Sequence, residues 1–255
     1  MANFPLAQCR IVMVETTHAG NIGAAARAMK TMGLSQLHLV RPLDYPSVEA
    51  TARASGAGDI LQNAVVHDSL EGALADVTWV FGASARQRTL PWPCVAPRQM
   101  GGMVAAHPAD GQIAVLFGRE ARGLTNEELQ LCHYHVTIPT NEEYGVLNIS
   151  AAIQVICYEL RMALVGAELP PVEGHLIQLP AVHWDEPPAD QAAMEYFMEH
   201  LERVLVKARF LDPRYPAKVM PRLRRLFMRT QMDKTEMGMM RGVLKAIEQA
   251  LPKGG

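Results

Sequence analysis

Six short runs of apolar, largely β-branched residues recur through the first part of the chain, and helical patterns fill most of the gaps between them. The runs cover residues 10–14, 37–40, 64–67, 77–82, 113–117 and 135–139. Strands that alternate with helices form a largely parallel sheet with both faces covered. With 255 residues, 49% of them hydrophobic, the chain can bury this core and support a second, smaller domain.

Three glycine-marked segments interrupt this pattern, at residues 21–33, 117–129 and 138–158. Each places turn residues against the start of a helix. In the last two, polar residues and glycines directly follow an apolar run, which is where α/β proteins collect ligand-binding backbone. The pattern favours an enzyme or a ligand-binding protein over a structural one.

The first glycine-marked segment has two interpretations. In the structural one, Asn21 is an N-cap, the alanines that follow are helix formers, and Gly33 is a left-handed C-cap. That interpretation leaves the small polar loop 16–20 unexplained, together with Arg27, which lies two turns into an alanine-rich surface. In the functional interpretation, Arg27 reaches a phosphate or a developing oxyanion.

Neither a GxGxxG sequence after the first strand nor a GxxxxGK[ST] sequence occurs, so any nucleotide-like cofactor must be held in another way. Residues that follow three of the predicted strands suit this task, since they would form adjacent loops at one edge of the sheet. They are Ala83 and Ser84, then Gly118, then Ile138 with Gly145, Val146 and Leu147. Their backbone amides and carbonyls would suit the edge of an adenine.

The composition changes at residues 166–190, which are rich in proline and acids and lack periodicity. We therefore predict domain 1–165, linker 166–190 and a helical domain 191–255.

One helix of the predicted helical domain places Arg222, Arg225 and Arg229 along one face with Arg224 nearby, and Leu223, Leu226 and Phe227 inward. A capping box at Asp233 and Glu236 opens a last helix, whose predicted inner face is Met237, Met240, Val243, Leu244 and Ile247.

The charge is divided unevenly between these parts. Residues 1–190 carry 11 Lys and Arg against 19 Asp and Glu, and residues 191–255 carry 13 against 7. The split suits an acidic catalytic body with a basic arm for a polyanion, although a solvated helical face explains it equally well.

Other classes of site and location are disfavoured. The start of the chain lacks the pattern of a signal peptide, and no apolar stretch is long enough to span a membrane, so we expect a cytoplasmic protein. The four cysteines suggest reduced thiols. His133 and His135 alternate as metal ligands sometimes do, but on a strand they more often mark a surface face, and we predict no metal.

A long helix predicted at residues 148–164 has no charged residue in its first eleven positions, so most of its circumference must be covered. Core burial would account for this. A subunit interface would also do so, because obligate interfaces resemble a core cut in half, and we expect a homodimer.

Long stretches of the chain resemble one family: ETTHAGNIGAAARAMKTMGL, SARQRTLPWP, VLFGREARGLTNEEL, residues 144–158 and KVMPRLRRLFMR. They are similar to the TrmJ-type tRNA ribose 2′-O-methyltransferases of the bacterial SPOUT superfamily. The resemblance implies an α/β fold with a SPOUT-type parallel sheet and a deep C-terminal trefoil knot, an exception to the rule that folds are unknotted, plus a small all-helical C-terminal domain. It also implies S-adenosyl-L-methionine as cofactor, a homodimer with active sites shared between subunits, and tRNA methylated at anticodon-loop nucleotide 32.

The resemblance also assigns residues to roles. The positions matching the cofactor contacts are Ala83, Ser84, Ala85, Gly118, Ile138, Gly145, Val146 and Leu147. The positions matching the catalytic residues are Asn21, Arg27, Glu120, Asn148 and Ser150. The arginines expected to bind RNA are Arg86, Arg88, Arg222, Arg224, Arg225 and Arg229.

Elementary chemistry constrains the role of Arg27. A ribose hydroxyl is a weak nucleophile until it loses its proton, and a guanidinium is always protonated in a protein, so it is a poor base. We therefore expect Arg27 to bind phosphate and stabilise the emerging alkoxide beside the cofactor of the other subunit, without a metal, while Glu120, Asn21 and Asn148 orient Arg27 and the loops. Two alternatives stay open: an rRNA 2′-O-methyltransferase, and a non-catalytic RNA-binding module with the same fold.

Overall fold

The computed structural model describes residues 4–84, 92–108, 111–165, 186–214 and 218–251. Two compact units are present, Met1–Val182 and His183–Gly255. The division falls inside the linker predicted at residues 166–190, most of which lies outside the described residues, so the exact domain boundaries stay a prediction. Within the described helices, none has the length and apolarity needed to cross a membrane.

The first unit is built on one parallel sheet in the order β3-β2-β1-β6-β4-β7-β5. Its strands are β1 (Cys9–Val14), β2 (Gln36–Val40), β3 (Val65–His67), β4 (Trp79–Ala83), β5 (Cys94–Val95), β6 (Ile113–Phe117) and β7 (Tyr134–Val136). All six residues of β1 and all five of β6 are buried, as expected where helices cover both faces. The predicted parallel α/β sheet is therefore confirmed.

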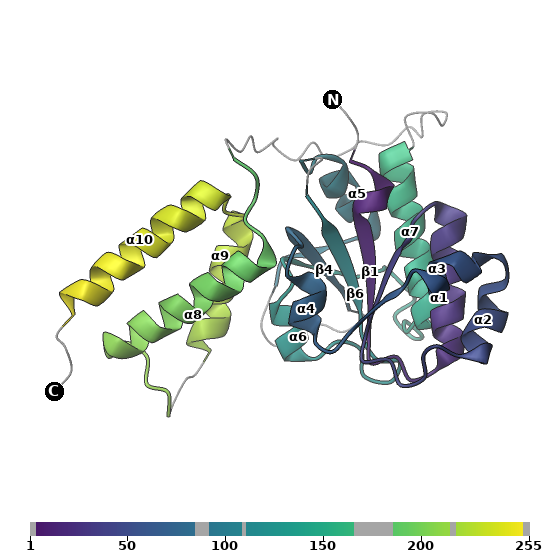
Figure 1. Cartoon of the computed structure of the whole chain (residues 1–255), viewed down its shortest axis with the longest axis horizontal. Coiled ribbons are helices and arrows are strands. Elements are labelled where there is room, and N and C mark those ends of the chain that lie inside the picture. The colour runs from purple at the N-terminus through teal and green to yellow at the C-terminus, as the bar shows by residue number, and fades with distance from the viewer. Residues whose placement is uncertain (1–3, 85–91, 109–110, 166–185, 215–217, 252–255) are drawn as a thin grey trace. The chain divides into compact units, whose positions relative to one another are not determined.

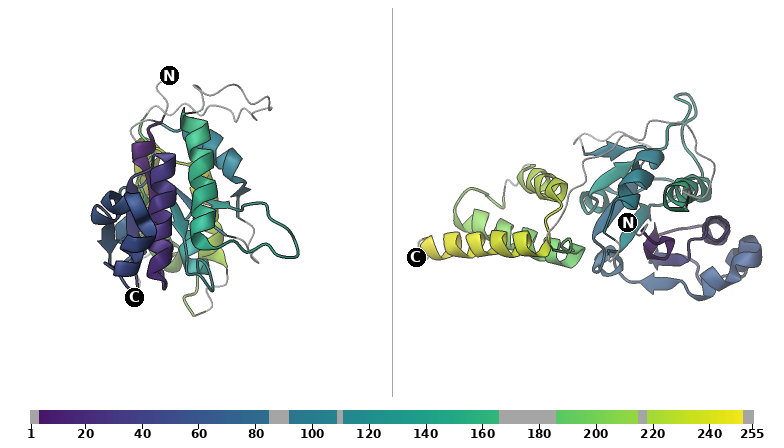
Figure 2. Two further views of the ribbon diagram at one scale, coloured as in Figure 1. Left: turned by 90° about the vertical axis from the view of Figure 1, so that its right-hand side faces the viewer. Right: turned by 90° about the horizontal axis from the view of Figure 1, so that it is seen from above.

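Two layers of helices cover this sheet (Figure 1). The helices are α1 (Ala19–Met32), α2 (Val48–Ala54), α3 (Gly58–Gln62), α4 (Leu70–Leu74), α5 (Pro97–Ala105), α6 (Asn126–Gln130) and α7 (Ile149–Val165). Helix α7 packs between α1 and α5 on one face, and Figure 2 shows α1 and α7 running side by side. On the other face, Leu74 of α4 and Leu129 of α6 pack over Val12, Val80 and Leu116 of the sheet.

The six predicted strands all exist, β6 with the predicted bounds and the others with ends shifted by one to three residues, but β5 was missed. It consists of only two residues, Cys94 and Val95, paired in parallel with His135 and Val136 of β7. A pair this short has no periodicity of its own, and its strand geometry depends on the neighbouring strand. The predicted helix 148–164 is confirmed with bounds one residue later.

The expectation that His133 and His135 mark a surface face was wrong. Both are buried. His133 Nδ1 accepts from the Val80 backbone N–H at 3.1 Å, and His135 stacks on Trp92 at a centroid distance of 5.6 Å. Burial lowers the pKa of His133 to about 3, which keeps the ring neutral. Within the described ranges no group of three or more candidate ligands is placed to hold a metal ion.

The second unit contains α8 (Gln191–Lys207), α9 (Val219–Thr230) and α10 (Lys234–Ala250). Its core includes Met194, Phe197 and Leu201 of α8 with Met237 and Leu244 of α10. The predicted helical domain is thus confirmed, as are the inward positions of Met237 and Leu244. The capping box is confirmed as well: Asp233 accepts from the Glu236 N–H at 2.7 Å, and Glu236 accepts from the Asp233 N–H at 3.0 Å.

Some inward positions predicted in this unit were wrong. Leu226, Val243 and Ile247 are 43–50% exposed, because helical periodicity identifies an apolar stripe but not how much of it neighbouring helices cover. Arg224 pairs with Glu195 of α8, with Nη2 2.7 Å from Oε2. This arginine therefore has a structural partner within the unit.

Candidate active site

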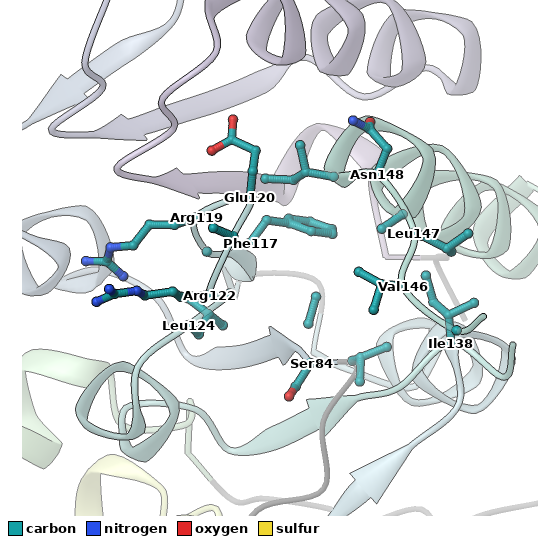
Figure 3. A pocket seen from close by; sticks show the side chains of 18 of the residues that line it. Ser84, Phe117, Arg119, Glu120, Arg122, Leu124, Ile138, Val146, Leu147 and Asn148 are labelled. Carbon is teal, nitrogen blue, oxygen red and sulfur yellow. The ribbon is translucent and has the colours of Figure 1, made fainter. Parts of the chain in front are cut away.

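A cavity of about 320 Å³ opens at the carboxyl ends of three neighbouring strands, β6, β4 and β7, beside the start of α7 (Figure 3). Loops at this end of a parallel sheet form ligand sites because the connecting backbone is free of the sheet's own hydrogen bonds. Seven of the eight predicted cofactor residues line it: Ala83, Ser84, Gly118, Ile138, Gly145, Val146 and Leu147. Ala85 lies outside the described residues, as do the predicted RNA-binding residues Arg86 and Arg88.

Several lining residues were not predicted: Phe117, Arg119, Arg122, Gly123, Leu124, Thr140 and Ala152 among them. Most belong to the same glycine-marked segments that predicted a ligand site. Their pattern indicated a turn, but the side of the turn that faces the cavity depends on the fold.

The glycine loop, residues 118–124, forms one wall of the cavity. Arg119 and Gly123 exchange backbone hydrogen bonds of 3.2 and 2.7 Å, so the loop folds back on itself. Gly123 has φ 68, and a Cβ on Gly118 would lie 2.1 Å from the Gly123 carbonyl carbon. Glycine is needed at Gly118 because the returning backbone occupies the space of any side chain.

Glu120 extends from the glycine loop to the start of α1. Its carboxylate accepts hydrogen bonds from the Thr17 N–H (3.1 Å) and hydroxyl (2.8 Å), the His18 N–H (3.2 Å) and the Asn21 amide (2.9 Å). Partial burial opposes ionisation, but the hydrogen bonds from Asn21 and Thr17 lower the pKa of Glu120 to about 2. The carboxylate is also well placed for the positive end of the α1 dipole.

A chain of amide contacts joins α1 to α7. Helix α1 begins at Ala19 with His18 as N-cap, so the interpretation of Asn21 as an N-cap was wrong. Instead the Asn21 side chain accepts from the Asn148 amide at 3.1 Å while donating to Glu120. Asn148 Oδ1 in turn accepts from the Ser150 N–H (2.9 Å) and hydroxyl (2.6 Å), as at a helix N-cap. Four of the five predicted catalytic residues thus form one hydrogen-bonded network at the cavity edge.

Arg27, the fifth, lies apart from this network. It is exposed on α1, is not among the residues that line the cavity, and has no hydrogen-bond or ion-pair partner in the part of the chain that the structure describes. The network therefore orients the loops and the ends of α1 and α7, and it makes no bond to Arg27. Gly33 ends α1 at φ 84, as predicted for a left-handed C-cap.

We expect Glu120→Gln to lower the free energy of unfolding of the first unit by about 1 kcal/mol at pH 7, since an amide offers one acceptor oxygen where the carboxylate offers two. The pKa is lowered in the folded protein, so this stabilisation is complete above the ordinary value of 4.5 and is lost as pH falls towards 2. Melting temperatures at several pH values test this. The difference between wild type and variant should narrow below pH 4.5.

The control is Glu71→Gln, which changes an exposed carboxylate in the first turn of α4. A pH-independent difference between Glu120→Gln and wild type would contradict the assignment of the pKa shift to this hydrogen-bonded network.

Comparisons with known proteins agree with this architecture. The model of the SpoU rRNA Methylase family matches residues 8–158, and that of the tRNA methyltransferase TrmJ C-terminal domain matches residues 192–254. The tRNA (cytidine/uridine/adenosine-2′-O-)-methyltransferase TrmJ of Pseudomonas aeruginosa is 48% identical over 241 residues, which are 94% of this chain and 93% of that protein.

Solved structures agree as well. The crystal structure of TrmJ from Z. mobilis ZM4 has a TM-score of 0.79 and 31% identity, and the match covers 94% of this chain and 98% of that one. The SpoU methyltransferase AviRb from Streptomyces viridochromogenes, solved in complex with the cofactor AdoMet, has a TM-score of 0.50 at 20% identity over 65% of this chain and 62% of that one, a likeness of fold alone. The chain therefore belongs to the SpoU methylase family and, within it, to the TrmJ methyltransferases.

Proposed function

We propose that this methyltransferase uses S-adenosyl-L-methionine to methylate the ribose 2′-hydroxyl of anticodon-loop nucleotide 32 in tRNA, in the cytoplasm. The observation that carries the proposal is the cavity at the ends of β4, β6 and β7, edged by the network of Glu120, Asn21 and Asn148. The near-full-length similarity to TrmJ proteins, including a matching C-terminal domain, supports tRNA as the substrate.

The residues of the cavity fit this cofactor. A volume of about 320 Å³ falls at the lower end of the range of small-molecule sites. Gly118 and Gly145 bring backbone close to the cavity, and a Cβ on Gly145 would lie 2.8 Å from Thr140 Oγ1. Ser84, Ile138 and Leu147 would flank the ligand. When bound, the cofactor supplies an activated sulfonium methyl group.

The protein's contribution is then alignment and charge stabilisation. The Glu120 network holds the start of α1 and the start of α7 together, which keeps the cavity walls in place. Arg27 stabilises the emerging alkoxide and binds the neighbouring phosphate. Its lack of a described partner leaves its five donors free for this task.

We further propose a homodimer in which Arg27 of the partner subunit completes each active site. Arg27 is exposed and is not a lining residue of the cavity of its own chain, which supports a shared site. Helix α7 has no charge in its first ten residues, yet its Tyr158 is 45% exposed. An exposed face without charge suits a subunit interface. We also expect the knotted path of the SPOUT family within residues 1–165.

The helical domain 191–255 is proposed to bind the body of the tRNA. Arg222 and Arg229 are exposed on α9, and their guanidinium groups have no hydrogen-bond or ion-pair partner within the residues that the structure describes. We expect the double variant Arg222→Gln/Arg229→Gln to weaken tRNA binding and to reduce the slope of log affinity against log salt by about 1 to 2, as the loss of two phosphate contacts requires. Filter binding at several salt concentrations measures this.

The matched control is Arg209→Gln/Lys245→Gln, which removes the same charge from exposed positions of the same unit. An equal loss in both double variants would mean that net charge, and not a site on α9, governs the affinity.

The proposed function is tested by methyl transfer from labelled S-adenosylmethionine to bulk tRNA and to rRNA, followed by nuclease mapping. Label at the 2′-hydroxyl of nucleotide 32 in tRNA supports the proposal. Label in rRNA alone would show that rRNA, and not tRNA, is the substrate. If the protein does not bind the cofactor, the alternative of a non-catalytic RNA-binding protein would hold.

A further inference from the structure

Arg119 of the glycine loop forms an ion-pair cluster with Glu15 and Glu128 that none of the assigned roles uses. Arg119 Nε donates to Glu15 Oε2 at 2.7 Å, and its Nη1 donates to both Glu128 oxygens at 3.0 and 2.9 Å. The side chains of Arg119 and Glu128 are only 19% and 12% exposed. A surface ion pair is a weak interaction, but this one is largely shielded from solvent and uses several donors of one guanidinium.

The two carboxylates belong to the elements on either side of the loop. Glu15 directly follows β1, and Glu128 lies in α6, which begins just after the loop. Glu128 also accepts from the Thr125 N–H at 2.7 Å and forms the capping box of α6. Arg119 therefore ties the glycine loop to the end of β1 and to the start of α6 at once.

Glu15 has an unusual backbone conformation. Its φ of 47 lies in the left-handed region, which a residue with a side chain rarely adopts. The Glu15 N–H donates to the Val40 carbonyl at 2.8 Å, and its carboxylate lies between Arg119 and Arg41. Burial opposes ionisation, but the hydrogen bonds from these two arginines hold the pKa of Glu15 below its usual value.

Arg119 and Glu120 extend from the loop in different directions, as Figure 3 shows. Glu120 accepts hydrogen bonds from Thr17, His18 and Asn21, which lie two to six residues after Glu15 in the chain. The glycine loop is thus held in place by the side chains of two consecutive residues, Arg119 and Glu120, while the loop lines the cavity. A loop held in this way needs little ordering when a ligand binds.

We infer that Arg119 is a positioning residue, which holds the glycine loop in the shape that receives the cofactor, with Glu15 and Glu128 as its anchors. The inference rests on the proposed function, because it takes S-adenosylmethionine as the ligand of the cavity. Arginine suits the position because its planar fork reaches two carboxylates, whereas lysine offers a single point charge. Arg119 acts on the loop and not on the transferred methyl group, so its loss weakens cofactor binding more than turnover.

The test is calorimetric binding of S-adenosylmethionine to the full-length protein. We expect Arg119→Gln to raise the Kd about tenfold or more and Arg119→Lys to raise it less, with kcat at saturating cofactor kept within about threefold. The matched control is Arg41→Gln. Arg41 pairs with the same Glu15, but its side chain is 56% exposed and is not part of the cavity wall, so we expect a wild-type Kd.

The outcomes separate the inference from the proposed function. A wild-type Kd in Arg119→Gln, or an equal loss in Arg41→Gln, overturns the positioning role. If Arg119→Gln does not fold, Glu15→Ala decides, because Glu15 is 34% exposed and alanine removes the acceptor of Arg119 Nε: a raised Kd supports the role and an unchanged Kd overturns it. If wild type itself binds no S-adenosylmethionine, the proposed function fails.

Discussion

Arg27→Ala should lower methyl transfer to tRNA about 10²–10³-fold, while the Kd for S-adenosylmethionine stays close to that of wild type. The reason is positional: Arg27 is exposed on α1 and does not line the cofactor cavity of its own chain, so its removal leaves that cavity intact. In the proposed mechanism, what is lost is the donor that stabilises the emerging alkoxide. Single-turnover transfer and calorimetry measure the two effects separately.

Arg27→Lys distinguishes a stabiliser from a base. Lysine is the better base but lacks the bidentate fork of arginine, so we expect it to recover only a small part of the activity at neutral pH. Activity of Arg27→Lys above that of wild type would show that the residue acts as the proton acceptor. Mixing Arg27→Ala with a variant defective in cofactor binding tests the proposed shared site, because in the proposed dimer one site of each mixed pair would be complete and activity would return.

Gly118→Ala should raise the Kd for S-adenosylmethionine more than about 100-fold, since the added methyl group requires the cavity wall to move. Its Cβ would lie 2.1 Å from the Gly123 carbonyl carbon and 2.2 Å from the Leu124 nitrogen, and both are backbone atoms. The bridge between Arg119 and Gly123 cannot persist with that contact, so the loop must open. Calorimetry measures the Kd, and the melting temperature shows that the variant is folded.

The matched control is Gly102→Ala. Gly102 lies in α5, and a Cβ there would meet nothing within 4 Å. We therefore expect the Gly102→Ala variant to bind the cofactor with the wild-type Kd, and its α5 to be more stable by up to about 1 kcal/mol. Tight cofactor binding by Gly118→Ala would show that the loop does not form the cavity wall in solution.

Much of the cavity was predictable because its backbone is local in sequence. The residues that line it follow apolar strands and contain the glycines that tight loops need, so Gly118 and Gly145 were identified from turn chemistry. The direction of the side chains was not predictable in this way. Asn21 has the sequence context of an N-cap, yet α1 begins at Ala19, two residues before Asn21. The side-chain amide of Asn21 donates to Glu120 instead.

The same distinction holds for burial. His133 and His135 alternate as surface residues do, but β4 and Trp92 cover them. Val243 and Ile247 have the spacing of a buried stripe, but α8 and α9 cover only part of α10. An apolar or polar pattern describes one element, and its burial depends on the element that packs against it.

The sequence by itself determined the parallel α/β sheet, the position of the loops that line the cavity and the helical C-terminal domain, because strand runs, glycine turns and helix periodicity depend on residues close together in the chain. Only the tertiary structure decided which side chains meet. Glu120 contacts Asn21 across 99 residues, Arg119 contacts Glu15 across 104, and Asn148 contacts Asn21 across 127. The first two contacts exist because β1 pairs with β6, the fifth strand after it in the chain, and the third exists because α7 packs against α1. Both arrangements are set by how whole elements pack.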